Sequence, residues 1–206
     1  YPDTFTVTDR VPSCAGFAFL GWFDKARTCK SSGQSSSPAI RKDGESVSFI
    51  YTDNDVYTLD ALWASIKAEG ATYPYDGEAH TIKSAEVAYN SGNLKDEYVK
   101  QIKDNHLVSV DKMQYATEEN GRYTSTMPTF KNAGTYDVYC KTIVKVGSTS
   151  KILTTKATVT INKRPVTITA ASAEKTYGEA DPSFAPAIMS NQVAGELTGI
   201  NLAVSR

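Results

Sequence analysis

The sequence predicts a mainly β protein, and three observations carry this prediction. Tyr, Thr, Val and Ser are plentiful, whereas long stretches of the helix formers Leu, Ala, Glu and Lys are scarce, and this composition favours strands. Short runs of alternating polar and apolar residues recur along the chain, as half-buried strands require. Clusters rich in turn-forming residues separate these runs. Strands at such short spacing, with turn signals between them, indicate a β-sandwich.

The charge balance bears on the class of partner. The 206 residues carry 22 basic and 23 acidic side chains, which gives a formal net charge of −1. Nucleic acids and acidic membrane surfaces are bound through a basic footprint, so we expect neither as the main partner. No apolar run approaches the roughly 18–20 residues of a membrane span, so we expect this segment to make no membrane contact. No signal peptide is present, and we expect any targeting segment to have been removed or to lie outside this stretch.

Residues 1–67 form the first predicted segment. The runs FTVTD, GFAFLGWF and ESVSFIY are predicted strands, and the Ser-rich run TCKSSGQSSSPAI is a predicted loop. Two spacings compete at the end of the segment. The helical spacing joins Leu59, Leu62, Trp63 and Ile66. The strand spacing joins Tyr57, Leu59, Ala61 and Trp63. Periodicity leaves both open, and the preceding turn signal TDNDV favours the strand.

Residues 68–163 form the second segment. Asp76–Gly77 lies between alternating residues and predicts a tight hairpin. Leu94, Tyr98 and Ile102 stand four apart and make a short helix possible. The runs KNAGTYDVYCKTIVKV and STSKILTTKATVTI predict two long strands that pair across the turn VGSTS.

Residues 164–206 form a third segment with two or three predicted strands. A sheet of this size buries too little apolar surface to be independently robust. Its candidate apolar residues are Val166, Ile168, Phe184, Ile188 and Leu197. The segment is either loosely held or ordered by a partner, and we expect it to dock on the second domain or on another copy of the chain.

The first segment contains a Gly–aromatic–x–Phe–x–Gly–Trp block and ends with L-x-A-x-W. The matching residues are Gly16, Phe17, Phe19, Gly21 and Trp22, then Leu59, Ala61 and Trp63. Nearly all of residues 1–67 thereby resembles the Listeria–Bacteroides repeat, a β-grasp-like module of internalins and other bacterial surface proteins, although the usual first strand is cut short at Tyr1. The resemblance implies a β-grasp-like module and favours the strand near residue 60.

The other two segments resemble a second family. YPYDGEAHTI, PTFKNAGTYDVYCK and KATVTINKRPV in the second segment resemble the mostly-β, bacterial Ig-like modules known as MBG domains. RPVTITAASAEKTYGEADPSF in the third resembles the opening of another such repeat, whose remaining strands we expect to lie beyond this chain. The resemblance implies an Ig-like domain over 68–163 and an incomplete repeat over 164–206.

The cysteines and histidines are few and scattered. Cys14 and Cys29 could pair in an oxidising setting, whereas Cys140 is predicted to be a small buried hydrophobe on one strand face with Tyr136 and Val138. Two histidines, His80 and His106, stand outside any recognisable nucleophile motif. No group of Cys or His has zinc-ligand spacing.

Few other patterns suggest a site. Asp53 and Asp55 could hold calcium, but a solvated turn is the favoured interpretation. No Gly-rich loop introduces a helix, so a phosphate cradle is not indicated. No Lys–Asn pair is identifiable as a cross-link. We therefore expect no catalytic residue, no metal and no cofactor.

Aromatic side chains offer the remaining candidates. Trp22 and Trp63 are predicted to be core anchors. Eight tyrosines crowd the second segment, namely Tyr73, Tyr75, Tyr89, Tyr98, Tyr115, Tyr123, Tyr136 and Tyr139. Exposed aromatics could stack on sugars or anchor a protein partner, but packing in or near the core is the favoured interpretation.

Two functional hypotheses follow from the resemblances. The first is a non-enzymatic segment of a secreted protein on the bacterial cell surface, whose tandem modules contact each other and act as a stalk or adhesin scaffold. The alternative is a module that binds a host glycan or host protein directly. A concave site lined by aromatic residues would favour the alternative, and its absence would favour the stalk.

Overall fold

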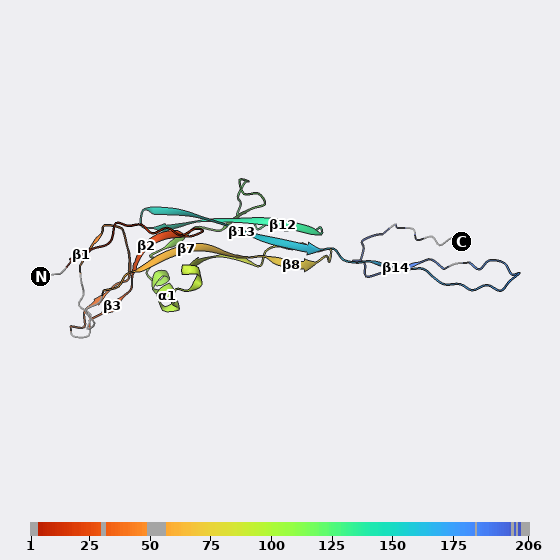
Figure 1. Ribbon diagram of the computed structural model, residues 1–206, viewed down its shortest axis with the longest axis horizontal. Coiled ribbons are helices and arrows are strands. Elements are labelled where there is room, and N and C mark those ends of the chain that lie inside the picture. Colours follow the sequence, from red (N-terminus) through yellow and green to blue (C-terminus); the bar gives the residue numbers. More distant parts are fainter. Residues whose placement is uncertain are drawn as a thin grey trace. The chain divides into compact units, whose positions relative to one another are not determined.

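The computed structural model describes residues 4–29, 32–48, 57–183, 185–198, 200 and 202. Within them the protein is mainly β, with several sheets in a sandwich-like arrangement, as predicted (Figure 1). The strands before the helix are β1 Thr4–Thr6, β2 Ala18–Asp24, β3 Arg27–Thr28, β4 Ser35–Ser36, β5 Ala39–Arg41, β6 Ser46–Ser48, β7 Asp60–Glu69, β8 Ala71–Pro74 and β9 Ser84–Tyr89. The remaining elements are the 3-10 turn η1 Asn90–Gly92, the helix α1 Asp96–Asp104, then β10 Ser109–Val110, β11 Gln114–Ala116, β12 Gly134–Val146, β13 Thr149–Asn162, β14 Thr167–Thr169 and β15 Ile188–Ser190.

The chain divides into two compact units. Unit 1 comprises Tyr1–Ala71, Thr81–Pro128 and Asp137–Thr158, and unit 2 comprises Thr72–His80, Thr129–Tyr136 and Val159–Arg206. These units cut the chain differently from the predicted divisions after residues 67 and 163. The first predicted division falls inside β7. The three family modules stay a prediction.

A four-stranded sheet of unit 1 has the order β5-β2-β7-β9. β7 pairs antiparallel with β2 on one side and with β9 on the other. The competition between helix and strand near residue 60 is thus resolved in favour of the strand. The Ser-rich run is not wholly a loop, because β4 lies within it and pairs with β3, which ends at the first residue of the run, Thr28.

The alternation of β7 separates core residues from half-buried ones. Leu62 and Ala64 are completely buried and Ile66 nearly so, whereas Trp63 between them is only half-buried. On β2, Phe23 is completely buried and its neighbour Trp22 is half-buried. The core of this sheet is therefore built from the residues beside the tryptophans.

A β-bulge interrupts β2 between Phe19 and Gly21. Phe19 lies opposite Trp63, and Trp22 lies opposite Ala61. Because the bulge inserts one extra residue, Phe19 and Trp22 point to the same side of the sheet although they are three residues apart. The bulge depends on Gly21, since a Cβ there would lie 2.6 Å from Ile40 Cγ2 and 2.8 Å from the Arg41 carbonyl oxygen.

The predicted short helix is confirmed as α1 (Figure 1). Ile102 is completely buried, and the Tyr98 ring lies 5.6 Å from that of Phe23. The Gln101 side chain accepts a hydrogen bond of 3.1 Å from the Ala26 amide just after β2. The helix is thereby fixed against the end of β2.

The second main sheet has the order β10-β12-β13-β8, and β11 also pairs with β12. β12 and β13 are the predicted long strands. Their inward residues Val138, Cys140, Val144 and Val159 are completely buried. Cys140 is the predicted small buried hydrophobe, and its desolvation raises the pKa of its thiol to about 11.

β7 leads into β8 through Gly70, which closely approaches β13. A Cβ at Gly70 would lie 2.4 Å from the Thr158 carbonyl oxygen. Five residues further on, the Tyr75 amide donates a 2.9 Å hydrogen bond to the Asn162 carbonyl. Gly70 thus lies beside Thr158 and Tyr75 beside Asn162. Residue numbers rise in the same direction along both segments, so β8 and β13 run parallel.

The predicted hairpin at Asp76–Gly77 does not form. Gly77 has the positive φ of a tight turn, +81°. However, β8 pairs with β13, and His80 forms an isolated bridge with Phe130. The residues before and after the turn thus pair with β13 and with Phe130 and not with each other. Local turn chemistry alone could not reveal these distant partners.

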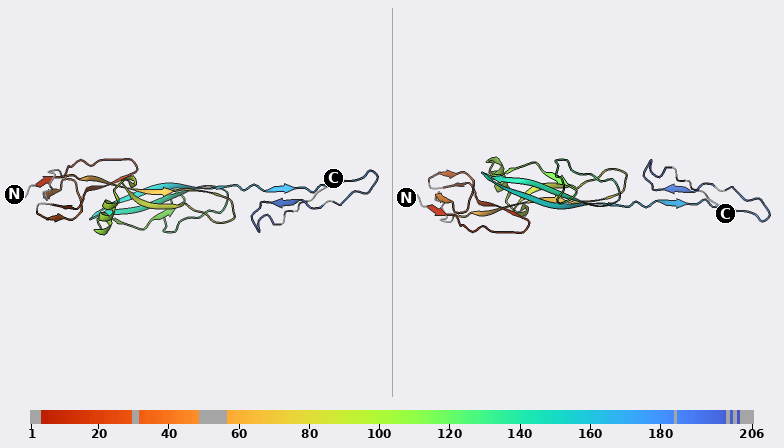
Figure 2. Two further views of the ribbon diagram at one scale, coloured as in Figure 1. Left: turned by 90° about the horizontal axis from the view of Figure 1, so that it is seen from below. Right: turned by 90° about the horizontal axis from the view of Figure 1, so that it is seen from above.

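The third predicted segment contains the antiparallel pair β14 and β15 (Figure 2). Within unit 2, the Tyr75 hydroxyl lies 2.6 Å from both carboxylate oxygens of Glu196. A Cβ at Gly77 would lie 2.8 Å from Val193 Cγ1. The segment after residue 163 thus contacts the turn around Gly77, in keeping with the expected docking within the chain.

The apolar residues of this segment remain largely accessible. Ile168 is 56% exposed and Ile188 is 70% exposed. Phe184, also predicted for this apolar face, lies outside the described residues.

Candidate functional site

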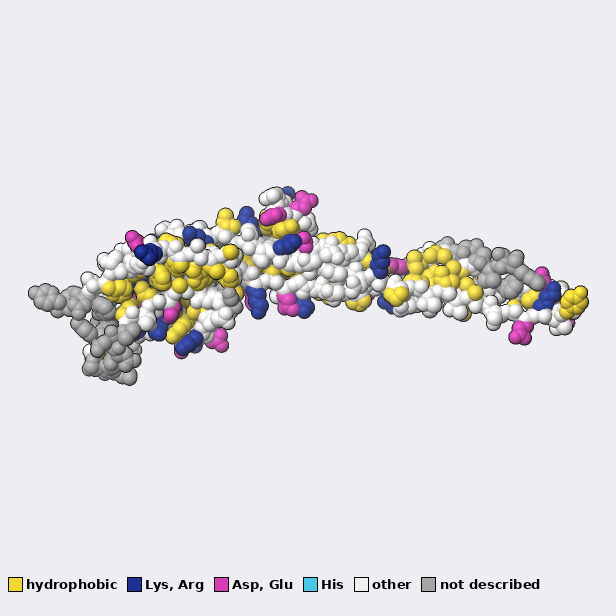
Figure 3. Space-filling view, in the orientation of Figure 1, with side chains coloured by type: hydrophobic (Ala, Val, Ile, Leu, Met, Phe, Trp, Pro, Cys, Tyr) yellow, Lys and Arg dark blue, Asp and Glu magenta, His cyan; other side chains and the backbone are white. Residues whose placement is uncertain are grey.

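Three aromatic side chains form a cluster on the half-buried face of β2 and β7, which we name the aromatic face: Phe19, Trp22 and Trp63. The Phe19 ring centroid lies 5.4 Å from that of Trp22 in an edge-to-face arrangement and 5.2 Å from that of Trp63. Such tilted pairs are the favoured geometry of aromatic rings. Figure 3 shows hydrophobic side chains gathered over this part of the molecule.

The prediction that Trp22 and Trp63 are core anchors is corrected by these positions. Both side chains are half-buried, and the Trp22 indole nitrogen donates a 3.2 Å hydrogen bond to Asp43 at an exposed site. The physical reason is the strand alternation, which gives the core positions to Phe23 and Leu62 instead.

Backbone contacts fix the position of Trp63. Asn90 reaches β7 from η1, and its amide oxygen accepts a 2.8 Å hydrogen bond from the Trp63 backbone amide. Its amide nitrogen donates a 3.1 Å bond to the Ala61 carbonyl. Asn90 has a positive φ of 48°, a conformation that Asn tolerates better than most residues.

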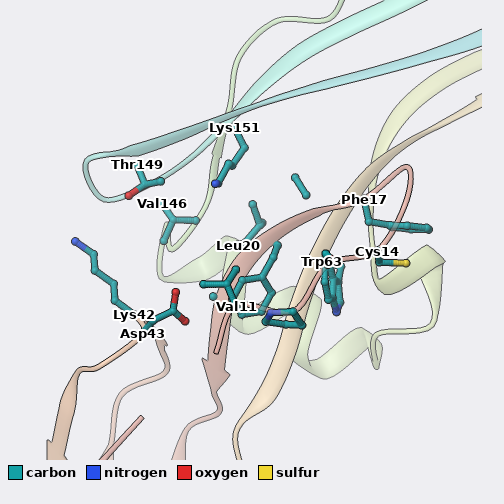
Figure 4. A pocket seen from close by; sticks show the side chains of 15 residues that line it. Val11, Cys14, Phe17, Leu20, Lys42, Asp43, Trp63, Val146, Thr149 and Lys151 are labelled. Carbon is teal, nitrogen blue, oxygen red and sulfur yellow. The ribbon is translucent and has the colours of Figure 1, made fainter. Parts of the chain in front are cut away.

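The aromatic face borders an open hollow of about 490 Å³ in unit 1 (Figure 4). Phe17, Trp63 and Cys14 line one end. Lys42 and Asp43, from the turn after β5, lie toward the other end. The tip of the β12–β13 hairpin adds Val146, Thr149 and Lys151 along a third side. The hollow thus combines an aromatic end with a charged end.

A second hollow of about 410 Å³ contains Tyr123 and Tyr139. Here the lysines already have partners. The Lys141 ammonium lies 5.1 Å from the centroid of the Tyr123 ring, and Lys156 pairs with Asp137 at 2.9 Å. Among the residues that line this hollow, both lysines are therefore engaged by neighbouring side chains.

A buried charged cluster lies at the end of β2, and sequence reasoning missed it. Asp24 is completely buried and pairs with Arg27, which is 8% exposed. Asp24 also accepts hydrogen bonds of 2.9 and 3.0 Å from Arg41 and one of 2.5 Å from the Tyr57 hydroxyl. The Asp24 carboxylate thus connects β2 with β5 through Arg41, and with the chain before β7 through Tyr57.

Tyr57 is the titratable group most affected by this cluster. Burial and the hydrogen bond to Asp24 raise its pKa to about 12. The Arg27 guanidinium lies 3.9 Å from the centroid of its ring. These contacts hold Tyr57 in place and give it a structural role.

The two histidines lie in separate, local contacts. The His80 ring stacks on Tyr73 at 4.1 Å and its Nε2 lies 2.8 Å from Asp76 Oδ1. His106 follows α1, and its Nδ1 lies 3.0 Å from the Lys103 carbonyl oxygen. Neither contact includes a Ser or Cys nucleophile.

The cysteines and acidic residues complete the comparison with the sequence. Cys14 is an exposed free cysteine and Cys29 is buried, and their pairing stays a prediction. Asp53 and Asp55 lie outside the described residues. Among the residues that the structure describes, no three His, Cys, Asp or Glu side chains gather as metal ligands.

The tyrosines mostly agree with the predicted packing near the core. Tyr89 is buried and the other seven are half-buried. Two of them stack on other rings, Tyr73 on His80 and Tyr136 on Phe130.

Comparison with known proteins found no matching family model, no matching curated protein and no matching solved structure. In the part of the chain that is described, no helix combines the length and apolarity needed to cross a membrane.

Proposed function

We propose that this chain is a non-enzymatic segment of a secreted bacterial cell-surface protein, acting as a stalk or adhesin scaffold. In this proposal, residues 1–67 are a β-grasp-like module of the Listeria–Bacteroides type. Residues 68–163 are an Ig-like module of the MBG type, and residues 164–206 begin another.

The parallel arrangement of β8 and β13 is the observation that carries the scaffold role. The chain enters this pair from β7 and leaves it after Asn162. Tension along the chain therefore pulls β8 and β13 in opposite directions along their length. Several hydrogen bonds must then break together, whereas a hairpin that is pulled open loses its bonds one at a time. A stalk under tension needs to unfold slowly when it is pulled.

Single-molecule force spectroscopy tests this role. Handles attached at Asp60 and Lys163 would load β8 against β13. Handles at Gly134 and Asn162 would open the β12–β13 hairpin from its free ends and serve as the matched control. We expect the first geometry to unfold at the higher force. Equal or lower force would contradict the scaffold role.

A second candidate function, direct binding of a host glycan or protein, is favoured by the hollow beside the aromatic face. Its lining is concave and partly aromatic, which is the feature expected of a binding module. A glycan array and a host-protein pull-down, each repeated with Trp63→Ala, test it. Binding that is lost in Trp63→Ala supports this function, and identical results for both proteins contradict it.

A further inference from the structure

The charged end of the hollow has an excess of positive charge. Lys42 lines this end and Lys151 lines the adjoining third side, together with a single carboxylate, Asp43. Asp43 already accepts the hydrogen bond of the Trp22 indole. Over the described ranges, neither lysine ammonium is engaged in an ion pair or side-chain hydrogen bond. The hollow thus presents two uncommitted cations to a ligand.

The size of the hollow favours a small ligand. A volume of about 490 Å³ falls within the roughly 300–1,000 Å³ of small-molecule sites. A stable protein partner would instead need roughly 800 Å² of surface on this side. The size therefore favours a short oligosaccharide over a folded protein.

The two ends of the hollow match two parts of an oligosaccharide that contains an acidic sugar. A pyranose ring has an apolar face of C–H groups that stacks on aromatic rings such as Trp63. A carboxylate accepts charge-assisted hydrogen bonds from lysine ammonium groups. Thr149, on the same side as Lys151, adds a hydroxyl that can donate to or accept from a sugar hydroxyl.

We infer that the hollow binds an oligosaccharide that carries a carboxylated sugar, with one sugar ring on Trp63 and the carboxylate of a further sugar toward Lys42 and Lys151. This inference rests on the direct-binding function and names the class of its ligand. It does not depend on the scaffold role, which the force measurement tests separately.

Titration calorimetry with the 206-residue chain tests the inference. The carboxylated probes are sialyllactose and a hyaluronan tetrasaccharide, and the neutral controls are lactose and chitotetraose. We expect at least one carboxylated probe to bind about tenfold or more tightly than its neutral control, because a charge-assisted hydrogen bond contributes on that order. This preference should weaken as salt is raised.

Variants locate the site. Lys42→Gln combined with Lys151→Gln should remove the preference for the carboxylate. Lys95→Gln, at the start of α1 and not among the residues that line the hollow, should preserve it. In a Trp22→Phe background Trp63 is the sole tryptophan, so a change of its fluorescence on binding would place the ligand at the aromatic face. Thermal melting of each variant shows whether it is folded.

Three results would overturn the inference. Equal affinity for the neutral controls would mean that the lysines do not recognise a carboxylate. Equal binding of a glutamate-rich pentapeptide would identify an acidic peptide as the ligand class. In both of these cases, binding that is lost in Trp63→Ala would still support the direct-binding function. If neither carboxylated probe binds, the inference fails, and an empty glycan array and pull-down would remove the binding function as well.

Discussion

The two faces of the sheet β5-β2-β7-β9 differ in how they use apolar side chains. One face buries Phe23 and Leu62 completely, whereas the other leaves Trp22 and Trp63 half-buried, although these are the larger residues. Each Å² of apolar surface left in water forgoes roughly 25 cal/mol of stabilisation. The comparison teaches that side-chain size does not identify the core, and that the aromatic face contributes less to stability than its size would permit.

The largest effect that we expect comes from the charged cluster at the end of β2, which supports the buried face. Asp24→Asn would leave Arg27 buried without its charged partner. Breaking a buried pair in this way costs about 3–5 kcal/mol, which chemical denaturation would measure. Glu45→Gln, whose ion pair with Arg41 is partly exposed, should cost less than about 1 kcal/mol. Equal losses in the two variants would show that the cluster is not a buried support.

Gly21→Ala tests how the aromatic face is assembled. The added Cβ would meet Ile40 and the Arg41 carbonyl, and Gly21 has a φ of +131°, so we expect a loss of about 1–3 kcal/mol. The near-ultraviolet circular dichroism spectrum should also change, because Phe19 and Trp22 would no longer point to the same side of the sheet. Gly147→Asn, at an open turn with φ +55°, is the control and should cost within about 1 kcal/mol. An unchanged spectrum in Gly21→Ala would show that the aromatic cluster does not depend on the bulge.

Tyr57 offers a smaller effect that depends on pH. Its folded-state pKa is raised from 10.0 to about 12, so its contribution to stability is complete below pH 10 and is lost as the pH rises through about 12. The fall in the free energy of unfolding over this window should be smaller in Tyr57→Phe than in the parent. Parallel pH profiles for both proteins would mean that Tyr57 titrates normally.

The smallest effect concerns the thiol at the aromatic end of the hollow. Cys14 is exposed, whereas Cys140 is buried with a raised pKa, so a thiol reagent should modify Cys14 rapidly and Cys140 only after unfolding. A Cys14–Cys29 disulfide, which the sequence allows, would instead leave no rapidly reacting thiol in the oxidised protein. Mass spectrometry of the modified protein distinguishes these outcomes.

Much of the secondary structure could be predicted from local patterns. The strands β7, β12 and β13 and the helix α1 follow from alternation and spacing, and the burial of Cys140 follows from its place in the alternation. These features depend on residues close together in the sequence, which is where pattern reasoning is strongest.

The features of the candidate site depend on longer-range geometry. The bulge at Gly21 reverses which residues share a face, and no spacing rule reveals it. Asp24 and Tyr57 meet across 33 residues. Lys151 reaches the hollow from the tip of a distant hairpin. The predicted hairpin at Gly77 is absent for the same kind of reason, because β8 pairs with β13 instead.

The neighbouring residues Leu62 and Trp63 give the most direct test of the difference between the two faces. The measurement is the free energy of unfolding of Leu62→Ala and Trp63→Ala by chemical denaturation, both relative to the parent. Leu62 is completely buried, so its truncation should cost about 2–5 kcal/mol. Trp63 is half-buried, so its truncation should cost less than about 2 kcal/mol although more atoms are removed. A greater loss for Trp63→Ala than for Leu62→Ala would make Trp63 a core anchor and contradict the account.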